Sequence, residues 1–188
     1  MDDIWAKYEG WLTDHFPEGR EALNPGAAEQ EIANLETAVG AKLPEDYRRF
    51  LLRHNGQKPG TVGLLHSNDF LSVADVLGEW KTMKRLLEDG HFPHRSESSP
   101  PGAVKCDWWR LLWIPITSEG DGNLECIDLD PDTAGDEGQV IDFDHETVHR
   151  CVLASSFQEW AWAYVQDVLA GEYVYSDDYG RLMPIDEL

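Results

Sequence analysis

The sequence predicts an α+β fold, in which a mixed but mainly antiparallel sheet of about four to six strands is flanked by helices. Apolar residues recur every three or four positions through much of the first 90 residues, which is the spacing of helices that bury one face. Between Trp108 and Phe143, short apolar runs alternate with turns rich in glycine and aspartate, as in an antiparallel meander. Because 188 residues suit one hydrophobic core, we expect a single domain over residues 1–188.

The first part of the chain carries the pattern of amphipathic helices. Residues 2–16 place large apolar side chains at helical spacing, and we expect this helix to extend the domain at its N-terminus. A second helix is expected over residues 28–39, because Gly40 suits the left-handed position that ends a helix. Pro44 fits the first turn of a third helix, which the Asn55-Gly56 pair ends.

The middle of the chain predicts one more helix between two less regular segments. Residues 61–66 are expected to form a short strand. Ser72 can accept a hydrogen bond from the first turn of a helix that runs from residue 73 to about residue 88. Three prolines and several serines in residues 91–105 predict an exposed loop.

After Trp108 the apolar pattern changes to that of strands. We expect three or four antiparallel strands up to Phe143, followed by a helix over residues 157–170 for which the Ser155-Ser156 pair provides a cap. The acidic C-terminal tail, from residue 173 onward, is expected to add an edge strand. Four aromatic side chains from these elements are expected to share one core: Tyr47, Phe50, Trp113 and Phe157.

A recognisable series of motifs runs through these elements. The series begins with a helix that contains a glutamate, a turn of small residues, a Leu-Pro pair, an acidic-aromatic helix and a closing Asn-Gly pair. The residues of these motifs are Glu36, Gly40, Leu43, Pro44, Asp46, Tyr47, Phe50, Leu51, Asn55 and Gly56. WIPIT, the Gly-Asp-Gly-Asn turn at 120–123, IDLDP, GQVIDF and ASSFQEWAWAYVQDVLAGEY follow in order. Over about residues 28–173 this series resembles the SUKH superfamily of bacterial immunity proteins, which also includes the yeast cell-wall synthesis regulator of the Smi/Knr type.

The resemblance implies a scaffold that binds another protein. Immunity proteins of this superfamily are similar in scaffold but neutralise chemically different toxins by direct binding. Most signature positions have a structural explanation in this sequence, either as core side chains or as helix ends, and none of them has the character of a catalytic group. The resemblance therefore implies neither a catalytic residue nor a cofactor.

The charge balance favours a basic partner. The chain has 36 acidic and 15 basic residues, a formal charge of −21, and its eight tryptophans indicate a folded core. Such a surface repels phosphate backbones, so we expect no nucleic-acid binding, whereas it attracts a basic protein over long range. No segment of the sequence is apolar over the roughly 18 residues that a membrane span needs. We expect a cytoplasmic protein whose three cysteines are reduced.

Turns between the predicted strands are the expected contact surface for that partner. They can present carboxylates from backbone that the sheet holds in place. Tryptophans beside them would supply apolar contacts. The predicted partner-binding residues are Glu119, Asp121, Asp130, Asp132, Asp136, Glu137, Trp108 and Trp109.

Two metal-binding patterns compete with this interpretation. His145, Glu146 and His149 match HExxH, in which two histidines one helical turn apart hold zinc, but the surrounding β-branched residues favour a strand. Asp128, Asp130, Asp132 and Asp136 alternate as calcium ligands do, but Thr133 and Gln139 stand where a calcium loop needs glycine and glutamate. We therefore expect no metal.

The leading hypothesis is an immunity protein that binds and neutralises a toxin, such as a basic nuclease or nucleotide-modifying domain. The alternative is a regulatory scaffold like the yeast relative. A zinc hydrolase that uses the HExxH residues is the third reading. A toxin gene next to this one would favour the first, and an isolated gene near wall-synthesis enzymes would favour the second.

Overall fold

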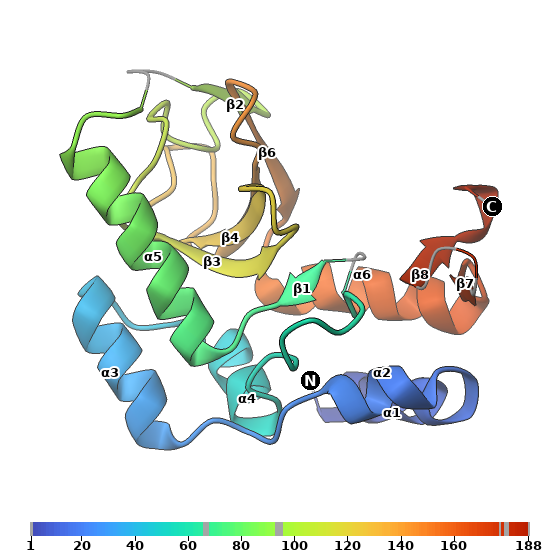
Figure 1. Cartoon of the computed structure of the whole chain (residues 1–188). Coiled ribbons are helices and arrows are strands. Elements are labelled where there is room, and N and C mark those ends of the chain that lie inside the picture. The colour runs from blue at the N-terminus through green and yellow to red at the C-terminus, as the bar shows by residue number, and fades with distance from the viewer. Residues whose placement is uncertain (1, 66–67, 93–95, 177, 179–180, 188) are drawn as a thin grey trace.

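The computed structural model describes residues 2–65, 68–92, 96–176, 178 and 181–187, and these form an α+β fold (Figure 1). The helices are α1 (Asp2–His15), α2 (Pro17–Ala22), α3 (Glu29–Val39), α4 (Glu45–Arg53), α5 (Val73–Glu88) and α6 (Phe157–Ala170), with a short 3-10 turn at Ile185–Glu187. The strands are β1 (Asp69–Phe70), β2 (Glu97–Ser99), β3 (Trp113–Ser118), β4 (Leu124–Asp128), β5 (Gln139–Phe143), β6 (His149–Ala154), β7 (Tyr173–Ser176) and β8 (Arg181–Pro184).

Six strands form one mixed sheet in the order β1-β3-β4-β5-β6-β2. Its centre is an antiparallel meander in which β3, β4, β5 and β6 pair in sequence; β3, β4 and β5 lie within the predicted stretch from Trp108 to Phe143, and β6 follows it. β1 adds an antiparallel edge beside β3, and β2 adds a parallel edge beside β6. The mixed, mainly antiparallel sheet that the sequence predicted is therefore confirmed.

Two local predictions near the sheet edges were wrong. The strand expected over residues 61–66 is absent from 61–65, which are irregular apart from a single bridge between Leu65 and Asn68, and residue 66 lies outside the described residues. The loop expected over 91–105 contains β2, while residues 93–95 lie outside the description. β2 is only Glu-Ser-Ser, so it lacks the apolar alternation by which a strand is recognised.

Helix ends follow the predicted local chemistry. Ser72 accepts a hydrogen bond from the backbone N–H of Asp75 at the start of α5, and Ser156 does the same for α6. Gly40 ends α3 with a φ of 78°, a conformation that costs glycine little. Within the described residues, no helix is both long enough and apolar enough to cross a membrane.

The buried apolar side chains form two clusters, one on each face of the sheet. The larger cluster contains Phe50 and Phe157 together with Ile114 of β3. The smaller one contains Trp113 of the same strand and is covered by the loop that includes Trp108 and Trp109. The prediction that Trp113 shares a core with Tyr47, Phe50 and Phe157 was wrong, because successive strand residues point to opposite faces.

Helix α1 is part of the larger cluster. Trp5 and Tyr8 are completely or almost completely buried there, and the Trp5 ring lies 4.4 Å from that of Phe50. On the polar side of α1, Glu9 accepts hydrogen bonds from Arg53 (2.5 Å) and from the His54 ring (2.8 Å). The expected N-terminal extension thus packs as a core element.

The C-terminal tail forms a hairpin of its own. β7 and β8 pair with each other in a separate two-stranded sheet, so the prediction of an edge strand was wrong. Figure 1 shows this hairpin at the C-terminal end of α6, away from the edges of the main sheet. Tyr175 stacks on Phe16 at 4.3 Å and Tyr173 meets Tyr164 at 5.0 Å, so the hairpin joins the two ends of the chain.

Candidate functional site

A groove of about 650 Å³ lies where β6 ends and α6 begins, beside the loops that follow β2 and precede β5. We call it the bulge groove. Its apolar lining is formed by small or branched side chains, including Pro100, Ala103, Ala134, Leu153, Ala154 and Ala163. Three carboxylates, those of Glu125, Asp136 and Glu159, also line it, and no lysine, arginine or histidine does so among the described residues.

An irregularity in the sheet aims Leu153 into this groove. Val140 pairs with Ala154 and Ile141 pairs with Val152, so Leu153 is an extra residue without a partner on β5. Such a β-bulge turns a side chain away from the regular pleat. The Leu153 side chain is 44% exposed, although its neighbour Val152 packs on the smaller cluster. The groove therefore has an apolar side chain that is available for contact.

Glu125 lies deeper in the groove than the other two carboxylates. It accepts hydrogen bonds from the Thr117 hydroxyl (2.8 Å) and the Trp160 indole N–H (3.2 Å), with the Asn68 amide at 3.4 Å. Burial raises the pKa of Glu125 above its ordinary value, and these hydrogen bonds only partly oppose the shift. All three donors are neutral, so the negative charge of an ionised Glu125 has no cation to balance it among them.

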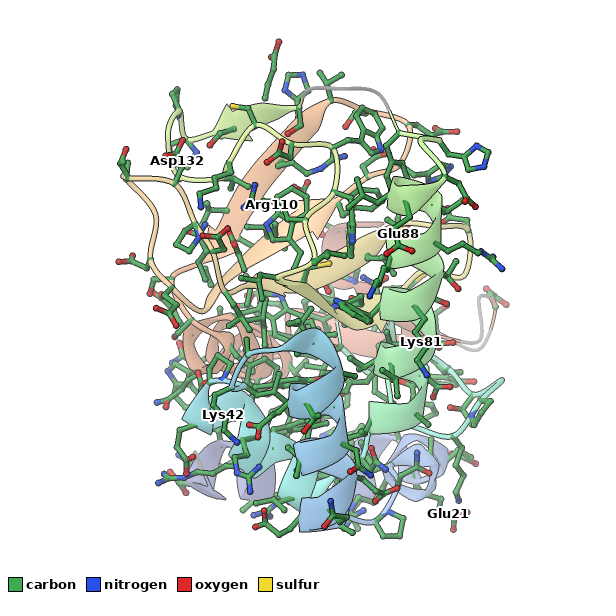
Figure 2. The ribbon with its side chains drawn as sticks, turned by 90° about the vertical axis from the view of Figure 1, so that its left-hand side faces the viewer. Glu21, Lys42, Lys81, Glu88, Arg110 and Asp132 are labelled. Carbon is green, nitrogen blue, oxygen red and sulfur yellow. The ribbon has the colours of Figure 1, made fainter. Side chains whose placement is uncertain are left out.

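The predicted acidic turn before β5 forms one side of the bulge groove. Ala134 and Asp136 line the groove, Glu137 is exposed beside them, and Asp132 is half-buried. Figure 2 shows Asp132 projecting from this turn, on the same upper part of the molecule as Arg110. The turn therefore adds carboxylates next to an apolar lining.

Asp130 differs from the other carboxylates of that turn. Lys105 and Arg110 both form ion pairs with it. The Lys105 hydrogen bond, together with that from Arg110, lowers the pKa of Asp130. Its charge is thus balanced within the chain, which removes it from the acidic charge that the turn offers to a partner.

Glu119 and Asp121 lie at the opposite end of β4 from this turn. β4 has five residues, so the two acidic turns are separated by about 14 Å or more at the usual rise per residue. Glu119 accepts a hydrogen bond from the Asn123 amide (3.0 Å), and Asp121 accepts one from the Asn123 backbone N–H (3.1 Å). The structure therefore does not bring all the predicted acidic residues together.

Trp108 and Trp109 are buried, with exposed fractions of 9% and 2%. Trp109 packs edge-on against Trp113 and Phe143. These side chains supply the apolar cover that the second face of the sheet needs. They are therefore not exposed, although they were predicted to contact a partner.

Sequence reasoning missed Arg150, a completely buried cation on β6. Its guanidinium lies 4.9 Å from the Trp108 ring and donates to the carbonyl oxygens of Thr147 (3.1 Å) and His149 (2.6 Å). Burial lowers the pKa of Arg150. An arginine inside the apolar run HRCVLA was the available signal, and its role here is to organise the turn before β6.

The metal-binding patterns have other roles in the structure. Residues 145–148 form a turn and His149 begins β6, so the helical spacing of HExxH does not occur. His145 lies 2.9 Å from the Asn123 side-chain oxygen instead. Asp128 is buried and accepts from Gln139 (3.0 Å). Within the part of the chain that the structure describes, no three side chains are placed to hold a metal ion.

The signature residues fasten the helices to one another. Glu36 accepts hydrogen bonds from Lys42 (2.6 Å) and from the backbone N–H of Leu43 (3.2 Å). Asp46 accepts one from the backbone N–H of Gln158 at the start of α6 (2.8 Å), a contact across 112 residues. Asn55 accepts one from the backbone N–H of Val73 at the start of α5 (2.7 Å). These contacts explain the signature structurally.

Comparison with known proteins finds relatives among regulators. The chain is 28% identical over 195 residues to the cell wall biosynthesis/cell cycle regulator smi1 of Schizosaccharomyces pombe, covering 97% of this chain and 39% of that protein. It is 22% identical to the cell wall assembly regulator SMI1 of Saccharomyces cerevisiae (93% and 41%) and 25% identical to the human F-box only protein 3 (90% and 34%).

The chain thus spans about two fifths or less of the length of these relatives. The model of the SMI1 / KNR4 family (SUKH-1) matches residues 26–161, from just before α3 to the fifth residue of α6. Because this match covers more than half of the 188 residues, the chain belongs to the SMI1 / KNR4 family.

Proposed function

We propose that this chain is a regulatory protein-binding domain whose partner contacts the bulge groove and the acidic turn beside it. Relatives that match over most of this chain are named as regulators of the fungal cell wall, which supports a regulatory role more than it supports toxin immunity. The proposal needs no catalytic group, because binding alone can hold a partner in place or block its surface.

The exposed Leu153 side chain inside a carboxylate-lined groove is the observation that carries this proposal. Protein interfaces typically combine an apolar centre, which supplies most of the affinity, with a polar rim. Leu153 and the alanines of the groove can form such an apolar centre, and Asp136 and Glu137 can form part of the polar rim. Because the bulge holds Leu153 in place, little ordering is needed on binding.

A toxin-immunity role is the second candidate, and the charge of the chain favours it. With 36 acidic against 15 basic residues, the chain attracts a basic protein over long range. An acidic groove could cover the basic active site of a nuclease. The gene neighbourhood separates the two candidates, since an adjacent toxin gene favours immunity and its absence favours regulation.

The test is a comparison of partners captured by two matched variants. Leu153→Asp places a charge in the groove, and Leu169→Asp places one on an equally exposed leucine of α6 outside it, since the two side chains are 44% and 42% exposed. Affinity purification with quantitative mass spectrometry from the native cells should show a partner that is lost from Leu153→Asp and kept by Leu169→Asp. Identical partners for both variants would refute the groove as the contact surface.

A further inference from the structure

The hydrogen-bonding capacity of Glu125 indicates what the bulge groove can receive. A carboxylate has about four acceptor positions. Thr117 and Asn68 donate to one oxygen of Glu125, and Trp160 donates to the other, so Oε1 keeps one position. A donor that enters the groove can complete this set, and it gains most if it is positively charged.

A metal ion is a poor candidate for that donor. An oxygen-binding cation such as Ca²⁺ takes six to eight oxygen ligands. The described residues do not place three such side chains together, although Glu125, Asp136 and Glu159 all line the groove. Glu159 is also engaged at the start of α6, where it accepts hydrogen bonds from the Ser155 backbone N–H (3.0 Å) and hydroxyl. Separate carboxylates along an apolar groove suit an elongated organic cation better.

Arginine fits this arrangement better than lysine. Its guanidinium is planar, carries five donors and is more weakly hydrated than an ammonium group, so it enters a half-buried site at lower cost. Its long stem can lie along Leu153 and the neighbouring alanines while the guanidinium meets Glu125. Trp160 also lines the groove, but its side chain is 3% exposed and packed in the larger cluster, so its part is to donate its indole N–H to Glu125.

We propose that the bulge groove binds an arginine side chain of the partner, within a segment that carries apolar residues on both sides, and that Glu125 is its acceptor. This inference rests on the proposed function, which it deepens by naming the chemistry of the partner. Among the described residues that line the groove, the only charged groups are carboxylates, and these supply the complementarity; the exposed Leu153 supplies the contact for the flanking apolar residues.

The experiment uses the full chain and three synthetic peptides. The probe is acetyl-Leu-Arg-Leu-amide, and its two counterparts carry citrulline, which is neutral and similar in shape, or lysine. The reporter is the Trp160 indole N–H resonance in the spectrum of the ¹⁵N-labelled protein, because this N–H donates directly to Glu125. Substitution of Trp160 by phenylalanine identifies that resonance.

The arginine peptide should shift the Trp160 resonance in a saturable way, and the citrulline peptide should bind about tenfold more weakly or worse, as expected when a charged hydrogen bond is lost. Glu125→Gln should weaken the arginine peptide by a similar factor. Glu88→Gln, an exposed position at the end of α5, should leave it unchanged. Equal binding of the arginine and citrulline peptides to the unmodified protein would overturn the proposal. Equal binding of the arginine and lysine peptides would overturn it as well.

The two proposals can fail separately. If Leu153→Asp loses its cellular partner but the peptides are not discriminated, the arginine site is refuted and the groove remains the contact surface. If the arginine peptide binds as expected but both leucine variants capture the same partners, the site stands as a binding pocket and the proposed function is refuted.

Discussion

Replacing Trp5 by alanine should remove a large part of the stability of the fold. The Trp5 side chain is 1% exposed and its ring lies 4.4 Å from Phe50 and 6.5 Å from Phe157. A buried tryptophan removes about 150–250 Å² from water, which at about 25 cal/mol per Å² gives an upper bound of about 4–6 kcal/mol. Measured truncations of this kind cost about 3–5 kcal/mol, so we expect a loss of about 4 kcal/mol.

Urea unfolding followed by circular dichroism measures this loss. The matched control is Trp11→Ala, which truncates a half-buried tryptophan on the same helix. We expect a clearly lower unfolding midpoint for Trp5→Ala, a smaller decrease for Trp11→Ala and similar slopes for both. A change below about 1 kcal/mol for Trp5→Ala would mean that α1 is a separable extension and would refute its role in the core.

Three other predictions test charges and metal. Burial opposes the ionisation of Glu9, but Arg53 and His54 outweigh it and lower the pKa of Glu9. The resulting stabilisation is complete at a pH above the ordinary pKa of 4.5 and is lost as the pH falls through the lowered pKa. The difference in unfolding free energy between the native chain and Glu9→Gln should therefore disappear in acid, which chemical denaturation at a series of pH values would measure. Neutralising Asp132, Asp136 and Glu137 together should slow association with a basic partner and flatten its salt dependence in surface-based kinetics, and a salt-independent native rate would exclude electrostatic steering. Protein purified without chelator should contain far less than one zinc per chain, and stoichiometric zinc in elemental analysis would contradict this prediction.

Local chemistry made the helices predictable from the sequence. Ser72 and Ser156 supply side-chain oxygens to N–H groups three residues later, and Gly40 takes a backbone conformation that ends α3. The strands of the meander were predictable for a similar reason, because apolar alternation and intervening turns are visible in neighbouring residues. The family resemblance rests on these same local motifs, and the match to residues 26–161 confirms it.

The pairings between distant segments could not be predicted from the sequence. β2 has no pattern of its own and becomes a strand because β6 offers it a free edge. Trp113 and its neighbour Ile114 enter different cores because the sheet has a cover on both faces. No local signal says which faces will be covered, so the shared core predicted for Trp113 was wrong.

The candidate site shows the same division. The acidity of the turn before β5 and the large negative charge of the chain can be read directly from the residues. The folded chain was needed to show that Lys105 and Arg110 balance Asp130 and that Trp108 and Trp109 are buried. It was also needed to show that the bulge exposes Leu153 in the groove that Glu125 lines. Charge is a property of each residue, whereas its neutralisation, its burial and the shape around it depend on residues that are distant in the chain and meet only in the folded protein.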